Sequence, residues 1–401
     1  MMVCHLVHRE RSGHVLRVQV LASSLSAGAA ICWAQTQAGW RFGYGLNMNI
    51  VLSHSSAFRH YRTPPVVLAL YGDCYGIDLS RERRRALRGS GSFGPLDMPI
   101  HVLVRSKTHV KATKTCIPHI WSGEIAPGMI RATDLGFAVT SPVFTMLCLA
   151  AKSSVAQVTM MLYELMGLFA VYRARHGERE YLQKLVDTGS FPIIDGWKPM
   201  LDNNGNITDL WDRPPLITID EVQRFCDQFR GMRGIGRLRQ ALDDVWGVAR
   251  SPFEVQAAML LGLPRRRGGY GFGSFELNKA IRLSDAARAI ARQQTCCIDL
   301  YAEGPEGLPP IAIECQGAGY HGGSERNAMD DNRALALQSM GLTVVRLRYE
   351  QIADPWRLQQ VASFLLGKHG RVWAPKTERL EQKERELRAD VLTDWWRLGS
   401  A

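Results

Sequence analysis

Two acidic residues in the last third of the chain have the types and spacing of a metal-binding pair. Asp299 lies in the apolar run CCIDLY, and Glu314 lies in the run IAIECQ, which ends at Gln316. A turn near Glu306 would fold these runs into an antiparallel hairpin and place Asp299 opposite Ile313 or Glu314. Paired carboxylates favour Mg²⁺ or Mn²⁺ and metal-assisted hydrolysis. The alternative is one ordinary acid on each of two solvated strand faces.

Other polar residues lie close enough in sequence to join this site. Glu254 follows Ser251 with the S-x-x-E spacing of a capping box, so it is either a helix cap or a third acid facing the site. His321 lies in the turn GAGYHGG, where it either contacts a phosphate or a water, or is an ordinary surface histidine. Asp331 and Arg333 follow on a predicted helix and face the site only if that helix packs on the sheet.

Arginines in two segments are candidates for contacting a phosphate backbone. Arg265, Arg266 and Arg267 open the glycine-rich run RRRGGYGFGS, and Arg346 and Arg348 alternate with apolar residues in VVRLRYE. Glycines let a backbone come close to a phosphate, which arginine then binds. The alternative in both segments is a solvated cluster of charges.

The elements that must position these residues are readable from periodicity and capping signals. Residues 295–350 predict strand, turn, strand, helix and strand, with the helix running from Ser324 to Gly341. Serine followed by proline predicts helix starts at Ser141 and Ser251. Residues 186–218 are rich in Gly, Pro, Asn and Asp and predict a loop. The charged segment 376–401 predicts either a surface helix or a partner-binding tail, with Trp395 and Trp396 as its anchors, and in the second case these tryptophans bind a partner protein.

Bulk composition narrows the class of protein and partner. The chain has 401 residues, which predicts more than one domain. The net charge of +11 favours a polyanion, with nucleic acid first among candidates and a basic solvated surface as the alternative. The nine cysteines form no C-x-x-C pair, which favours the cytoplasm and argues against a zinc site. No apolar run approaches the roughly 18–20 residues of a membrane span, so no membrane partner is expected.

Together, these motifs resemble a known nuclease family. SPFE, the Asp299 strand, IECQG with its following histidine, and D-x-R-x-x-x-L with G-x-x-V-x-R resemble the very-short-patch-repair-like branch of the PD-(D/E)xK superfamily, over about residues 250–370. The resemblance implies a restriction-endonuclease-like domain with Asp299 and Glu314 as metal ligands. It also implies that Glu254 is the acid of the core helix and His321 the histidine that follows the metal-binding strand.

The chain departs from this family at one position and is similar to a second family elsewhere. Gln316 stands where the motif has lysine, and glutamine can position a water but carries no charge. Lys279 and Arg292 are the candidates for replacing that charge. Residues 50–175, with SHSSAFRHY and VTSPVFTMLCLA, are similar to the body of abortive-infection antitoxins of type IV toxin–antitoxin systems. The winged helix expected before that body is not evident in residues 1–45.

The predicted fold class is α/β, with a mixed sheet flanked by helices after an α+β module. Residues 1–245 form the predicted antitoxin-like regulatory or recognition module, 246–375 the nuclease-like domain and 376–401 the charged tail. The predicted function is Mg²⁺- or Mn²⁺-dependent endonuclease activity on DNA rather than RNA, in phage defence or DNA repair. Its catalytic residues are Asp299, Glu314, Gln316, His321 and Glu254. The alternative is a non-catalytic nucleic-acid-binding regulator with a degenerate nuclease fold.

Overall fold

The computed structural model describes most of the chain in two units. The described residues are 34–36, 39–41, 47–48, 50–71, 92–93, 96–106, 112–133, 135, 137–317 and 324–400. Met1–Asn47 forms one unit and Met48–Ala401 the other. In the first, β1 (Ala34–Thr36) and β2 (Gly39–Arg41) pair antiparallel. Across the described residues, none of the helices is both long and apolar enough to cross a membrane.

A five-stranded mixed sheet begins the larger unit. Its order is β8-β7-β4-β10-β9. The strands are β4 (Val51–Leu52), β7 (Ile100–Val104), β8 (Cys116–Ile120), β9 (Ile130–Ala132) and β10 (Ala138–Thr140). All five residues of β7 are buried, because helix α1 (His54–Arg62) packs on this strand. The short helix α2 (Pro65–Leu70) follows α1, and the small hairpin β5 (Ser92–Phe93) and β6 (Leu96–Asp97) precedes β7.

Buried helices form the centre of this unit. Helix α4 (Pro142–Ala150) begins at Ser141, whose hydroxyl accepts a hydrogen bond from the backbone N–H of Phe144 at 3.4 Å. This confirms the predicted helix start, since a serine cap and a proline at the first position favour the same boundary. Helix α5 (Val155–Met166) follows behind its own serine cap, and α7 (Ile219–Gln228) and α8 (Ile235–Leu242) pack against the pair.

The segment predicted as a loop over residues 186–218 contains a β-hairpin instead. The strands β12 (Lys198–Leu201) and β13 (Ile207–Asp212) pair antiparallel, and β11 (Phe169–Val171) joins them in the order β11-β13-β12. The Asp and Asn residues that suggested a loop make the tight turn: the Asp202 carboxylate accepts from two backbone N–H groups, and Gly205 has φ of +81°. Helix α6 (His176–Asp187) packs on β13.

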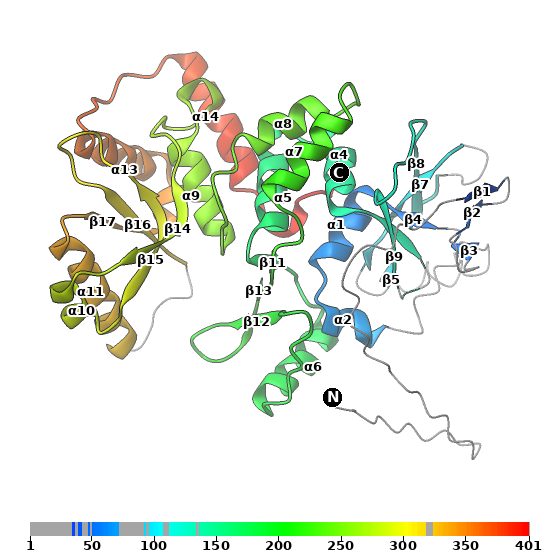
Figure 1. The fold of residues 1–401 in the computed structure, drawn as a ribbon, viewed down its shortest axis with the longest axis horizontal. Helices are drawn as coiled ribbons and strands as arrows, with labels where there is room; N and C mark the ends of the chain where they lie inside the picture. The colour runs from blue at the N-terminus through cyan, green and yellow to red at the C-terminus, as the bar shows by residue number, and fades with distance from the viewer. Residues whose placement is uncertain are drawn as a thin grey trace. The chain divides into compact units, whose positions relative to one another are not determined.

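The C-terminal part contains the second large sheet, with the order β14-β15-β16-β17. The strands are β14 (Glu276–Arg282), β15 (Thr295–Ala302), β16 (Ile311–Gln316) and β17 (Thr343–Arg348). The first three are antiparallel, and β17 runs parallel to β16. The helices are α9 (Pro252–Gly262), α10 (Asp285–Ala291), α11 (Ser324–Ser339), α12 (Tyr349–Ala353) and α13 (Pro355–Lys368). In Figure 1, α10 and α11 lie together beside this sheet, and α9 lies between the sheet and the central helix α5.

This arrangement confirms the α/β class and corrects one boundary. The predicted strand through residue 350 ends at Arg348, because Gln351 caps a new helix by accepting from the Arg348 backbone N–H at 2.7 Å. The larger unit, Met48–Ala401, includes both residue 245 and residue 375. The predicted division of the chain at these two positions stays a prediction.

The C-terminal segment is built into the fold. Helix α14 (Glu378–Val391) packs against α5 and α9, and a short turn (Trp395–Arg397) follows it. Trp395 is buried, and its indole N–H donates to the buried Glu164. The Arg59 guanidinium lies over the Trp396 ring at 3.5 Å from the ring centre. The tryptophans predicted to anchor a partner protein therefore pack within this chain, and a partner for the exposed face of α14 stays a prediction.

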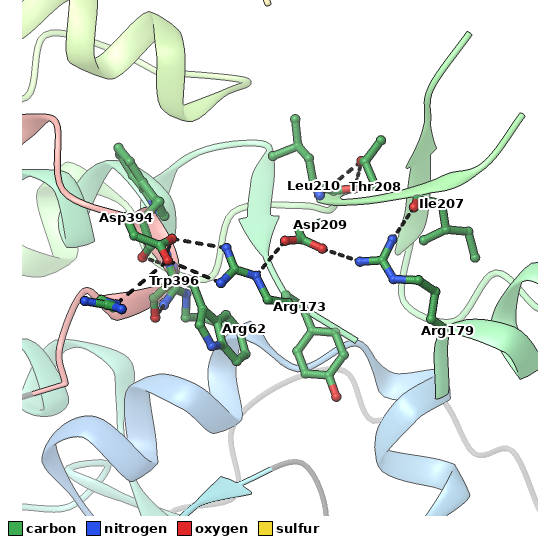
Figure 2. A network of polar contacts seen from close by, with 12 residues as sticks. Arg62, Arg173, Arg179, Ile207, Thr208, Asp209, Leu210, Asp394 and Trp396 are labelled. Carbon is green, nitrogen blue, oxygen red and sulfur yellow. Dashed lines mark hydrogen bonds and ion pairs between the residues drawn. The ribbon is translucent and has the colours of Figure 1, made fainter. Parts of the chain in front are cut away.

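Ion pairs hold this segment to the hairpin as well. Figure 2 shows Arg173 between two acids: its Nε lies 2.8 Å from Asp209, and its Nη1 lies 3.2 Å from Asp394 in the C-terminal segment. Arg179 of α6 reaches the same Asp209 from the other side. These side chains are partly exposed, so each pair contributes at most about 1 kcal/mol. They orient the segment, and the buried contacts around Glu164 hold it from the other side.

Candidate functional site

The predicted acids lie opposite one another across the hairpin. Leu300 pairs with Ile313, which places Asp299 opposite Glu314 one step further along the antiparallel register. Opposed residues of an antiparallel pair share a face of the sheet. The Asp299 Oδ2 accepts a hydrogen bond from the backbone N–H of Cys315 at 2.7 Å, just beyond the last ladder pair. The predicted register is thus correct, and the two acids lie where the strands begin to part.

The same row continues onto both outer strands. Leu277 pairs with Leu300 and Lys279 with Ile298, which places Asn278 of β14 level with Asp299. On the other side, Glu314 pairs directly with Arg346 of β17. The row across the sheet is Asn278, Asp299, Glu314 and Arg346. The sequence prediction included its two acids but missed Asn278, whose φ of +52° marks a local break in β14.

Glu254 approaches this row from helix α9 and also caps that helix. Its Oε1 accepts from the Ser251 hydroxyl at 2.8 Å, and the Ser251 hydroxyl accepts from the Glu254 N–H at 3.2 Å. Its Oε2 accepts from the Asn278 amide at 2.7 Å and from the Arg250 N–H at 2.9 Å. Both predicted roles are therefore compatible: the capping contacts exist, and Asn278 links this carboxylate to the row of Asp299.

Burial raises the pKa values of these three acids, and the Asp299 carboxylate adds to the rise at Glu254 and Glu314. Burial, followed by the nearby Asp299 carboxylate, raises the pKa of Glu254 to about 7. The same two causes, in the same order, raise the pKa of Glu314 to about 7, against the opposing effect of Arg333. Burial also raises the pKa of Asp299, while the Cys315 N–H and the arginines Arg333 and Arg250 oppose the rise. Excess negative charge of this kind is stabilised by a bound cation.

These pKa values predict that the site destabilises the fold at neutral and higher pH. A carboxyl whose pKa is higher in the folded state contributes stability below its unfolded pKa and loses that contribution as pH rises through the folded value. The free energy of unfolding of the metal-free protein should therefore fall between about pH 4.5 and pH 7. Glu314→Gln should remove about 1–2 kcal/mol of that fall. Urea unfolding at a series of pH values measures it, with Glu306→Gln in the hairpin turn as the control, and identical pH profiles for Glu314→Gln and wild type would contradict the assignment.

The cation nearest the acids comes from a helix that the sequence prediction did not use for this purpose. The Arg333 Nη2 of α11 lies 3.1 Å from the Glu314 Oε1 and also donates to the Cys297 carbonyl. Arg250, directly before the cap of α9, is exposed and lowers the pKa of Asp299. Arg333 was expected to face the site if its helix packed on the sheet, and its contact with Glu314 confirms that expectation. Arg250 was not among the predicted site residues.

The two residues predicted to replace the missing lysine lie elsewhere. The Lys279 ammonium pairs with Glu276 at 2.8 Å and lies 3.8 Å from the centre of the Tyr301 ring. Arg292 ends α10 with φ of +54°. Alternation along β14 turns Lys279 away from its neighbour Asn278. Neither prediction is supported, because Arg333 is the cation that contacts the acid pair.

Gln316 and His321 are the two remaining residues of the predicted site. Gln316 ends β16 two residues after Glu314, pairs with Arg348 in the parallel register and is partly buried. It therefore shares the face of the acids, as predicted. His321 lies outside the described residues, so its role stays a prediction.

The arginine triplet has a structural role that the sequence prediction did not include. Arg267 forms an ion pair with the buried Asp244, and Arg265 donates to the Pro375 carbonyl at 2.9 Å and lies over the Trp373 ring. Arg266 is exposed. Phosphate binding by Arg265 or Arg267 would require these contacts to break. Phosphate binding by the exposed Arg266 would not require either of them to break.

The acid pair offers oxygen ligands, so it fits Mg²⁺ or Mn²⁺ better than a softer metal that prefers nitrogen and sulfur ligands. Over the described residues, no group of three or more His, Cys, Asp or Glu side chains has the arrangement of a metal centre. Mg²⁺ needs only one or two carboxylates, with waters and substrate phosphates completing the shell. Asp299 and Glu314, with pKa values raised by burial, meet that requirement. They are the residues that would hold the ion.

A second cluster, of histidines, lies in the N-terminal sheet. The His101 Nδ1 is 2.8 Å from the His119 Nε2, and the His54 ring stacks on His119 at 3.6 Å between centres. Burial is the first cause that lowers the pKa of His101 and His119 to about 4 and that of His54 to about 2. These rings do not form a metal-holding group among the described residues, and their lowered pKa values indicate a set of packed neutral imidazoles.

Comparison with known proteins adds no relative to this picture. No protein-family model, no curated protein and no solved structure matches the chain. The candidate site is therefore argued from its own geometry.

Proposed function

We propose that the chain is a metal-dependent endonuclease whose C-terminal part has a restriction-endonuclease-like fold. The observation that carries this proposal is the placement of Asp299 opposite Glu314, with the pKa of each raised by burial. DNA is preferred over RNA as substrate on the nuclease resemblance, and the net charge of +11 favours a polyanion. Phage defence and DNA repair are the proposed settings.

Each residue of the site has a proposed role. Asp299 and Glu314 hold the cation, and Glu254 keeps Asn278 in the row through a 2.7 Å hydrogen bond. The bound Mg²⁺ or Mn²⁺ supplies Lewis acidity and lowers the pKa of a bound water. Gln316 orients the attacking water, and His321 assists at the phosphate. The exposed Arg250 and Arg266 bind the backbone of the nucleic acid.

The proposed compartment is the cytoplasm. The described cysteines Cys116, Cys148, Cys226, Cys296, Cys297 and Cys315 are all free thiols. Unpaired cysteines in this number agree with a reducing environment.

A plasmid-cleavage assay tests the proposal directly. Supercoiled plasmid is incubated with wild type and with Glu314→Ala, in Mg²⁺, in Mn²⁺ and in a chelator. Wild type should nick or linearise the plasmid only with metal, and the variant should not. Equal cutting by both proteins, or cutting in the chelator, would reject the assignment.

The second candidate is a non-catalytic nucleic-acid-binding regulator of toxin–antitoxin type. The observations that favour it are the pairing of Glu314 with Arg333 at 3.1 Å and glutamine at position 316. This candidate predicts salt-dependent DNA binding without a metal requirement. Calorimetric titration separates the two functions, because a vestigial site gives no saturable heat with Mg²⁺.

A further inference from the structure

Among the described residues, two arginine–glutamate pairs are buried or half-buried, and they are held very differently. The first is Arg62 with Glu164, both 0% exposed. The Arg62 Nε and Nη2 donate to Glu164 at 2.7 and 2.9 Å, and Nη1 and Nη2 donate to the carbonyls of Trp396 and Trp395 at 3.2 and 2.8 Å. Every nitrogen of this guanidinium is engaged, so the pair is fixed in place.

The second pair, Arg333 with Glu314, is joined through one guanidinium nitrogen. The Arg333 Nη2 donates to the Glu314 Oε1 and to the Cys297 carbonyl, and the guanidinium also contacts the Cys296 thiol. The Arg333 Nε is buried without a hydrogen-bond partner among the described residues. The side chains are 30% and 18% exposed, so solvent reaches both. A guanidinium bound this way costs less to displace than Arg62 does.

The charges around Glu314 explain why a counter-ion is needed there. The carboxylates of Asp299 and Asp330 both raise the pKa of Glu314, and Arg333 lowers it. Without a metal ion, Arg333 offsets part of this repulsion. A divalent cation would serve the same carboxylate and carry the same sign of charge, so the two compete.

We propose that Arg333 is a displaceable counter-ion, which occupies Glu314 until a divalent cation binds and so sets the concentration at which the site fills. This inference rests on the proposed function of the acid pair. The site then fills only at a higher cation concentration, because the cation must displace an arginine as well as lose its own waters. The released guanidinium is then free to pair with a phosphate of the substrate.

Calorimetric titration of the full chain with MgCl₂ at about pH 8, above the pKa of about 7 of Glu314, tests the inference. Arg333→Gln should bind Mg²⁺ about ten-fold more tightly than wild type, the effect of one pKa unit of lost competition. Arg333→Lys keeps the charge and should stay within about two-fold. Arg288→Gln is the matched control, since Arg288 lies 3.1 Å from Asp285 on the neighbouring helix α10. Arg333→Met retains the aliphatic stem and replaces the glutamine variant if that one does not fold, as judged by thermal unfolding.

The outcomes separate the inference from the proposed function. Tighter binding by Arg333→Gln, including binding that appears only in this variant, supports the counter-ion. Saturable binding by wild type that is lost in Glu314→Gln but unchanged or weaker in Arg333→Gln overturns the counter-ion and leaves the metal site standing. The absence of saturable heat in both wild type and Arg333→Gln overturns both.

Discussion

Glu164→Ala is expected to lower the free energy of unfolding by about 3–5 kcal/mol, the usual cost of breaking a buried ion pair from one side. The Arg62 guanidinium would remain fully buried without its partner, because both side chains are 0% exposed. The Val171 N–H and the Trp395 indole N–H would lose the same acceptor. Urea unfolding followed by tryptophan fluorescence measures the loss.

The exposed ion pair in the same neighbourhood is the control for this result. Arg173→Ala removes contacts to Asp209 and Asp394 at a side chain that is 48% exposed, and it should cost less than about 1 kcal/mol. If Glu164→Ala costs no more than Arg173→Ala, the buried network is not what joins the C-terminal segment to α1 and α5.

Asp299→Asn and Glu314→Gln are each expected to lower the rate of metal-dependent plasmid cleavage by about 10²- to 10³-fold. Both residues are proposed to hold the same ion, so the loss of either should remove most of what the pair contributes. The double variant should therefore be only slightly slower than either single variant. Initial rates at saturating Mg²⁺ measure the effect, and Glu306→Gln in the hairpin turn should cut at the wild-type rate.

A multiplicative loss in the double variant would show two acids that act independently. That result would argue against a shared ion even if each single variant were slow. Wild-type cleavage by Asp299→Asn, in contrast, would remove Asp299 from the site altogether.

The local elements were largely predictable, because their signals lie within a few residues of one another. Ser141 before Pro142 predicted the start of α4, and the turn near Glu306 between CCIDLY and IAIECQ predicted the hairpin and its register. The hairpin at 198–212 was missed because its Asp and Asn residues suit both a tight turn and an open loop. The structure resolves this ambiguity through the pairing of β13 with β11, whose residues are far from the turn.

The sequence by itself determined the acid pair, since an antiparallel hairpin joins residues whose separation is set by one short turn. Only the tertiary structure decided which cation meets that pair, because Arg333 reaches Glu314 from a helix whose packing no local pattern encodes. The same holds for Trp395, which was predicted to anchor the C-terminal segment or bind a partner and which completes a buried network around Glu164. Packing between distant segments depends on the burial of apolar surface over the whole chain. A periodic pattern of a few residues does not predict that packing.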